Sequence, residues 1–550
     1  MTLSAFPAIT KLPKSAANVQ DLTLRDFSGG LRVSENETNL RSRFSVVADN
    51  VFRDEEQGMK VRYGTKELAT CSSVILETAF FNNSVICFLQ NGNIEAVNLA
   101  GVVVPIWNTA IAALLPGSPA AWSAGALSVD TAVFGSALIV VNGQDKPLSI
   151  STSLVVTYLQ DPATGSNLFT PITSFVTTAA NYCIMAGFND TDEIFISSAG
   201  TSGVWPGDAA PNNSISIKLG AYTATTGTKI LGVADFRNSL VVFFEEYVLV
   251  LELDVFDAGG DHTPKVVDTL QDTKIINHRS LFTTNKELAF ASRTGVQTLT
   301  QQQFSAQLSP ADLTADLGKL YAQSIAKLDI GSNFSYVVRD PAEKRLFVFL
   351  RQIDETYQVF AMTFKDGFKQ VSWSKILGWS FQGGVETGQN RLVFFEDTKL
   401  YLYGNGTVED EDYYTDKQTD VFAGTPIDFA WELPWFDANS RIRSKGLVNV
   451  AMETRGTAEF ALSIFIDNIY KRLDGSLNPT MVLQFRGGDT PGYGVDVGGF
   501  GGGRRTNDER MYKMPSKFNI VKLRFTGSTS AALKFSSISL IYRKAQGFRR

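Results

Sequence analysis

One short pattern occurs seven times between Ala79 and Tyr403: an apolar strand, a tight polar turn and a second, denser apolar strand. From Ser84 to Arg391, six intervals span 307 residues, or about 51 residues for each repeat. A repeated unit of roughly 40–50 residues built from short strands is typical of the blade of a β-propeller. We therefore predict an all-β chain with a propeller of about seven blades, with six or eight as alternatives. The copies are Ala79–Ile86, Val133–Val140, Thr177–Ile184, Asp235–Val242, Phe282–Ala289, Pro341–Val348 and Thr387–Phe394.

In several repeats a third apolar strand follows these two strands, for example Tyr247–Leu251 and Leu400–Tyr403. These strands are almost continuously apolar, which indicates that both of their faces are covered, as happens when blades stack face to face. Asn, Gly and Lys at the connections are expected hairpin residues.

The sequence divides into four parts around these repeats. Residues 1–66 form an N-terminal arm with short edge strands, 67–403 the propeller, 404–423 an acidic connector, and 424–550 a second all-β module that resembles a sandwich. In an alternative division, the strands after residue 424 complete the propeller and the N-terminal arm closes it.

Three insertions interrupt the repeats. Asn108–Leu115 resembles a short helix, and Ala199–Lys229 is predicted to be a long loop rich in Gly, Ala, Thr and Asn. Ser309–Asp312 carries an N-cap signal with proline at the first helical position, so we predict an amphipathic helix from there to about Ala326.

Composition excludes several classes of function. The net charge is −6, which disfavours a protein that grips DNA by neutralising its phosphates. No run approaches the ~18 apolar residues of a membrane span. Lys11 and Lys14 stand where a signal peptide would be apolar, so we expect a protein made and assembled in a cytoplasm.

Residues that could hold a metal or a cofactor are few. The three cysteines, Cys71, Cys87 and Cys183, lie in or beside apolar segments and are predicted to be buried, reduced thiols. There are only two histidines, His262 and His278. We predict no metal site and no cofactor.

Candidate catalytic residues are also weak. Glu245 and Glu246 could supply the carboxylate pair of a glycosidase, but they fall at a predicted hairpin corner, where charge normally faces solvent. The acidic run Glu409–Asp412 lacks the glycine and the final glutamate of a calcium-binding EF-hand loop. We therefore predict no catalytic residue and no enzymatic activity. Buried anchors are the expected role of the tryptophans Trp122, Trp205, Trp373, Trp379, Trp431 and Trp435.

A series of short motifs resembles the tail nozzle proteins of short-tailed bacteriophages, also called tail tubular protein B or head-to-tail stabilisation proteins. The resemblance spans most of the chain and depends on the order of its motifs. Arg32–Val33 departs from it, since many relatives have a polar pair there, and the proline often found before the Asn–Val segment is absent. The motifs are Asp26–Leu31, Ala48–Val51, Arg62–Gly64, Val140–Pro147, Gly232–Phe236, Thr425–Ile427, Leu433–Phe436, Ser444–Leu447 and Ile541–Lys544.

The resemblance implies a virion structural protein of the phage tail, assembled in the bacterial cytoplasm. Such subunits form a hexameric ring below the portal and adaptor proteins, extend the DNA channel, close it before infection and let DNA pass on ejection without sequence-specific binding. They also offer attachment points for tail fibres or spikes. The loops Ala199–Lys229 and Gly487–Gly503 are our candidates for contacts between subunits or with a gate.

Two other functions stay open at this point. One is a propeller-type binding module that recognises a receptor or a glycan. The other is a tail-associated glycosidase that uses Glu245, Glu246 and the 409–412 run.

Overall fold

The chain consists of two compact units in the computed structural model. The terminal unit contains Met1–Tyr63, Ser372–Lys375 and Thr425–Arg550, and the propeller unit contains Gly64–Val371 and Ile376–Gly424. The structure describes residues 19–544 apart from 35–39, 55, 113–121, 123–127, 160–170, 189–190, 203, 207–213, 223–228, 246, 257–261, 272–273, 284–287, 302–307, 331–332, 366, 405–412, 420–423, 438–444, 457–458, 467–480 and 487–516.

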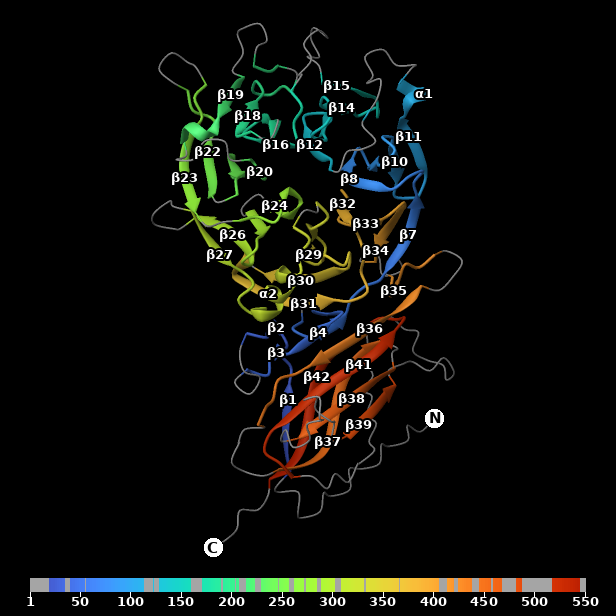
Figure 1. Ribbon diagram of the computed structural model, residues 1–550. Coiled ribbons are helices and arrows are strands. Elements are labelled where there is room, and N and C mark those ends of the chain that lie inside the picture. The colour runs from blue at the N-terminus through green and yellow to red at the C-terminus, as the bar shows by residue number, and fades with distance from the viewer. Residues whose placement is uncertain are drawn as a thin grey trace, which may run out of the picture. The chain divides into compact units, whose positions relative to one another are not determined.

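The described residues include seven propeller blades of four strands each (Figure 1). Six blades are separate four-stranded sheets, and the sixth blade is the four-stranded end of a larger sheet. The first four blades are β8 (Ile75–Phe81), β9 (Ser84–Leu89), β10 (Ile94–Asn98) and β11 (Val103–Trp107); β12 (Asp130–Phe134), β13 (Ala137–Val141), β14 (Leu148–Ser151) and β15 (Val156–Tyr158); β16 (Phe175–Ala179), β17 (Tyr182–Ala186), β18 (Glu193–Ile196) and β19 (Ile215–Lys218); and β20 (Gly232–Phe236), β21 (Ser239–Phe243), β22 (Tyr247–Glu252) and β23 (Lys265–Gln271).

The remaining three blades have the same plan, except that the last one takes its outer strand from the start of the unit. They are β24 (Leu281–Thr283), β25 (Leu288–Ala291), β26 (Val296–Gln301) and β27 (Leu308–Asp312); β28 (Tyr336–Asp340), β29 (Arg345–Arg351), β30 (Tyr357–Lys365) and β31 (Gln370–Ile376); and β32 (Gly383–Glu386), β33 (Leu392–Glu396), β34 (Lys399–Tyr403) and β7 (Thr65–Thr70).

The first strands of successive blades contact one another in a closed cycle. β8, β12, β16, β20, β24, β28 and β32 follow in that order, and β32 contacts β8 again. These strands line the middle of the ring, and the prediction of a propeller with about seven blades is confirmed. The seventh blade is completed by β7, which precedes the first blade, and not by strands after residue 424.

The repeated turns have the backbone that tight hairpins require. Asn82 and Asn83 have φ values of 47° and 61°, and Arg237 and Asn238 have 53° and 66°. Two successive residues with positive φ give a turn whose twist matches the paired strands. Side chains of the second strand then alternate between two neighbours. In β9, Ile86 and Phe88 pack toward the second blade, while Val85, Cys87 and Leu89 pack toward the seventh.

Two local predictions were wrong. Residues Ser309–Asp312 do not begin a helix but lie in β27, which pairs with β26, and α2 spans only Lys319–Ala326. Sheet pairing overrides the local cap signal here, and an edge strand tolerates a proline. The predicted loop Ala199–Lys229 contains β19 and the short helix η3 (Leu219–Tyr222), because the alternation of Ile215 and Ile217 suits an outer strand.

The described helices are short. α1 covers Thr109–Ala112 within the predicted helix Asn108–Leu115, and the other short turns are η4 (His278–Ser280) and η5 (Gly367–Lys369). Across the described residues, none of the helices is long and apolar enough to cross a bilayer.

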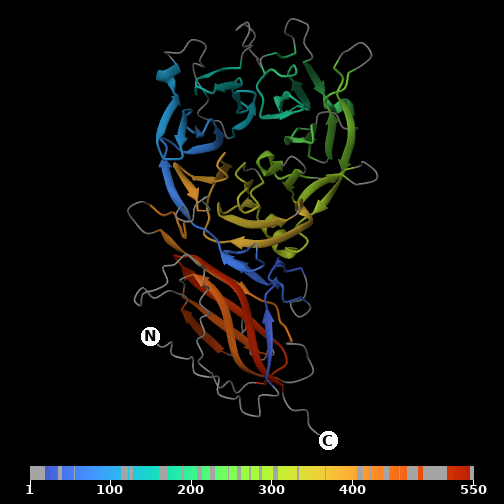
Figure 2. The same ribbon diagram turned by 180° about the vertical axis from the view of Figure 1, so that it is seen from behind.

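The terminal unit is a sandwich of two sheets. Its N-terminal strands pair with strands from the other end of the chain, as β1 does with β42 (Figure 2). One sheet contains β40 (Lys517–Phe518), β37 (Lys445–Gly456), β42 (Leu533–Lys544), β6 (Met59–Val61) and β5 (Val51–Arg53), with β1 (Val19–Leu24) beside β42. The other contains β4 (Val47–Asp49), β36 (Thr425–Glu432), β41 (Val521–Thr529), β38 (Glu459–Ile466) and β39 (Met481–Arg486), and β2 (Gly30–Leu31) pairs with β3 (Phe44–Ser45).

Aromatic side chains fill the space between these two sheets. Trp431 of one sheet lies 5.3 Å, between ring centres, from Phe535 of the other. Phe525 and Phe27 lie 4.9 Å and 4.8 Å from Trp431. The predicted sandwich-like module after residue 424 is therefore present, and the N-terminal segment contributes strands and a core residue to it.

Candidate functional site

A three-residue turn directly before the innermost strand of the fifth blade carries two side chains that reach the other blades. The turn η4 precedes β24, and Asn277 caps it: the Ser280 N–H donates to Asn277 Oδ1 at 3.0 Å, and the Ser280 hydroxyl donates to the Asn277 carbonyl at 2.6 Å. This cap fixes the direction of His278 and Arg279, whose side chains extend to the other blades.

Arg279 joins the fifth blade to the first, sixth and seventh. Its Nε lies 2.6 Å from Oε2 of Glu77 in β8. Its two terminal nitrogens donate to the carbonyls of Asn333, just before β28, and Gln382, just before β32, at 3.1 Å and 3.3 Å. The guanidinium carbon also lies 5.5 Å from the ring centre of Tyr336.

His278 joins the fifth blade to the second, third and fourth. Its Nε2 lies 2.9 Å from Oδ2 of Asp130, and its Nδ1 accepts from the N–H of Val233 at 3.4 Å. The Phe175 ring lies 4.9 Å from the imidazole. Asp130 Oδ2 also accepts from the N–H of Val176 at 2.7 Å. We call Glu77, Asp130, His278 and Arg279 the axial hub, because together they contact strands of all seven blades.

Two glycines leave room for the axial hub. A Cβ on Gly383 would lie 2.5 Å from the Arg279 guanidinium and 2.1 Å from the Phe395 ring. A Cβ on Gly232 would lie 3.0 Å from Nδ1 of His278. The beginning of β32 therefore has no room for a larger residue beside the hub, and the beginning of β20 has little.

The charges of the axial hub are only slightly exposed. Glu77 and Arg279 side chains are 14% and 13% exposed, and Asp130 and His278 are both 18% exposed. Burial raises the pKa of Glu77, and the Arg279 guanidinium opposes that rise. Both imidazole nitrogens and the guanidinium are engaged by neighbours, so the hub fastens the blades together and leaves no unengaged base among its four members.

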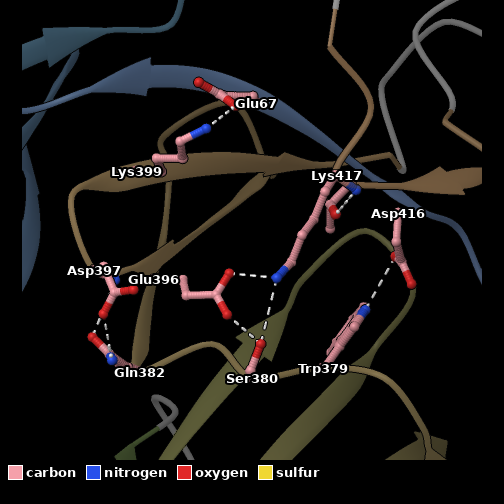
Figure 3. A network of polar contacts seen from close by, with 10 residues as sticks. Glu67, Trp379, Ser380, Gln382, Glu396, Asp397, Lys399, Asp416 and Lys417 are labelled. Carbon is pink, nitrogen blue, oxygen red and sulfur yellow. Dashed lines mark hydrogen bonds and ion pairs between the residues drawn. The ribbon is translucent and has the colours of Figure 1, made fainter. Parts of the chain in front are cut away.

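A second polar cluster lies where the ring closes (Figure 3). Glu67 of β7 pairs with Lys399 of β34 at 2.8 Å. On the other side of β7, the Gln418 N–H donates to the Thr65 carbonyl and the Glu67 N–H donates to the Gln418 carbonyl, both at 2.8 Å. The chain that leaves the last blade thus returns to pair with the strand that completes it.

Side chains hold this returning segment in place. Lys417 Nζ lies 2.5 Å from Oε2 of Glu396, which also accepts a hydrogen bond from the Ser380 hydroxyl (Figure 3). The indole N–H of Trp379 donates to Asp416 at 3.2 Å. We call residues 415–418 and these partners the closure clasp.

Of the residues named from the sequence, His278 and Trp379 belong to these two clusters, but the candidate catalytic carboxylates do not. Glu245 is exposed in the β21–β22 hairpin, away from the axial hub contacts, whereas Glu246, the 409–412 run and Gly487–Gly503 lie outside the described residues. In the part of the chain that the structure describes, no group of three or more His, Cys, Asp or Glu could hold a metal. The six tryptophans predicted as anchors are all buried.

Sequence reasoning missed the axial hub. The signal was present as an Asn–His–Arg–Ser turn directly before the innermost strand of the fifth repeat, in a chain with only two histidines. Its partners are spread over six other repeats, so their convergence could be found only from the closed ring.

Comparisons with known proteins add little to this description. No family model matches the chain, and no curated protein matches it. The WD40 repeats of RRP9 are 10% identical, with a TM-score of 0.39 over 62% of this chain and 99% of that one. U3-55K is 9% identical, with a TM-score of 0.37 over 62% and 98%. The strand pairing itself defines the class: this is a β-propeller protein with an added β-sandwich.

Proposed function

We propose that this protein is a non-enzymatic scaffold that works by binding other proteins, and more specifically a ring-forming tail nozzle subunit of a short-tailed bacteriophage. The broader part of the proposal is supported by the axial hub and the closure clasp. Their charged groups pair with one another and hold the blades of the propeller together. A propeller fastened in this way is suited to present surfaces to partners.

The narrower part of the proposal, the tail nozzle subunit, depends on a contact between two of the motifs that resemble the nozzle proteins. Asn50 of the Ala48–Val51 motif and Arg62 of the Arg62–Gly64 motif are both almost completely buried, and Arg62 Nε donates to Asn50 Oδ1 at 2.8 Å. Asn50 has a φ of 55°, and its side-chain amide donates to the Asp428 carbonyl at 2.7 Å. Two segments that carry the resemblance are thus in direct contact in the buried framework of the sandwich.

In this proposal the subunits form a closed six-membered ring in the virion tail, between the adaptor or portal proteins and the fibres or spikes. The net charge of −6 suits DNA that passes through without being retained. Closed rings arise when each copy presents two different complementary surfaces to its neighbours.

The assembly state of the purified full chain tests the proposal. Mass photometry and negative-stain images should show closed rings of about six copies of the 60.1 kDa chain. Single copies at every concentration, together with binding to a glycan array, would instead identify a propeller-type receptor or glycan-binding module.

A sugar-release assay tests the absence of enzymatic activity. The wild-type chain and the Glu245→Gln variant should release equally little reducing sugar from bacterial surface polysaccharides. Release by the wild type that disappears in the variant would instead establish the tail-associated glycosidase.

A further inference from the structure

Two of the three cysteines lie at the junction between the strand that closes the ring and the first blade. Cys71 follows β7 directly, and its N–H donates to the Thr398 carbonyl at 2.8 Å. Cys87 is in the middle of β9 and faces the seventh blade, in the same apolar cluster as Cys71. Both thiols are free and buried.

A cross-strand pair brings the segment of Cys71 to the face of β9 that carries Cys87. Glu95 of β10 lies opposite Cys87 in the register of β9 and β10, so their side chains share one face of the blade. Oε2 of Glu95 accepts from the N–H of Ser72 at 3.2 Å. The residue next to Cys71 is therefore held on the face where Cys87 projects.

The two cysteine side chains also interact. The Cys71 side chain, burial and the Glu95 carboxylate together raise the pKa of Cys87 well above its usual value. A raised pKa keeps the thiolate fraction of Cys87 small, so this thiol stays reduced under mild conditions. Cys183 packs in a different apolar cluster, with Ile139 and Met185, and does not share this contact.

We propose that Cys71 and Cys87 form a latent disulfide site, which a small peroxide oxidant converts to a crosslink that holds the β7–β8 junction to the first blade. Hydrogen peroxide first oxidises one thiol to a sulfenic acid and is reduced to water. The second sulfur then attacks the sulfenic sulfur, the S–S bond forms, and the hydroxyl leaves as a second water. Two thiols and one peroxide thus give one disulfide and two waters.

The crosslink would affect the fold at one place. It would close the loop that contains β8, the innermost strand of the first blade, and so restrict the unfolded chain. The folded ring already holds both cysteines in one apolar cluster. We therefore expect the oxidised protein to melt several degrees higher than the reduced protein.

The test uses the full chain treated with hydrogen peroxide. Thiols are counted under denaturing conditions before and after treatment, and the count should fall from three to one. Glu77 lies between the two cysteines, so a glutamyl endopeptidase separates them unless a disulfide joins them. The joined peptides should be about 2 Da lighter than the sum of their reduced masses, since two hydrogens are lost.

Two variants serve as controls. The Cys183→Ser variant keeps only Cys71 and Cys87, and treatment should remove both of these thiols, as it does in the wild type. Cys87→Ser should give no joined peptide and should leave Cys71 as a sulfenic acid that dimedone traps. Three surviving thiols in the treated wild type, or a crosslink that involves Cys183 or a second copy, would overturn the proposal.

Discussion

Nε of Arg279 lies 2.6 Å from Oε2 of Glu77, and this ion pair joins the turn before the fifth blade to the innermost strand of the first. Neither side chain is more than 14% exposed. Removal of one member of a buried pair leaves the other charge without compensation, which is costlier than the loss of an exposed pair. The axial hub is therefore expected to dominate the polar contribution to the stability of the ring.

Replacement of Arg279 by methionine tests this expectation. Arg279→Met should lower the free energy of unfolding of the propeller by roughly 3 kcal/mol, because Glu77 stays buried without its partner. Urea unfolding followed by tryptophan fluorescence measures the change. In the double variant Glu77→Gln with Arg279→Met, part of the loss should return, because no uncompensated charge is left.

Lys399→Met is the matched control for this prediction. Lys399 pairs with Glu67 at 2.8 Å, but its side chain is 44% exposed and solvent screens the interaction. Its loss should cost less than about 1 kcal/mol. Equal losses in Arg279→Met and Lys399→Met would show that the axial hub has no special role.

The space around the hub can be tested independently of its charges. In Gly383→Ala, the new Cβ would lie 2.1 Å from the Phe395 ring and 2.5 Å from the Arg279 guanidinium, so these side chains or the innermost strand must shift. Overpacking of this kind typically costs about 1–3 kcal/mol. Thermal unfolding should show a lower Tm for this variant. Gly446→Ala, whose Cβ would meet nothing within 4 Å, should leave the Tm unchanged.

The repeats could be predicted from the sequence because their second and third strands are apolar and their turns have a recurrent chemistry. The fourth strand of each blade was harder to find. Strand β23, for example, alternates exposed and partly buried residues, and β27 carries a helix-capping signal and a proline. The role of β7 was still harder to predict from the sequence, because its partner β34 lies at the far end of the unit. Local patterns identify strands, whereas closure depends on pairing between distant segments.

The pH dependence of stability should reveal the cost of a partly buried carboxylate. Burial raises the pKa of Asp235 above its usual 3.8, and Oδ1 of Asp235 has no hydrogen-bond partner among the described residues. As the pH rises from 3.8 through the folded-state pKa, the unfolded chain loses its proton first, so the folded state becomes relatively less stable. Asn at this position has no such transition.

Asp235→Asn should therefore gain stability relative to the wild type between about pH 4 and pH 7. Urea unfolding of both proteins at the two pH values measures the difference. A difference that stays constant across this range would mean that the Asp235 carboxyl titrates alike in the folded and unfolded chains.

The closure clasp can be opened at a single glycine. A Cβ on Gly64 would lie 2.0 Å from the Thr415 carbonyl oxygen, which belongs to backbone and cannot rotate away. Gly64→Ala should displace residues 415–418 from β7 and weaken the hydrogen bonds between Glu67 and Gln418. Hydrogen exchange measured by mass spectrometry should then show about 5- to 150-fold loss of protection in 65–70, as expected for a local cost of 1–3 kcal/mol. Peptides from β21 and β22, which do not contact the clasp, should keep their protection. If 65–70 exchanges as slowly in Gly64→Ala as in the wild type, its pairing with β34 alone closes the ring, and the returning segment is not needed.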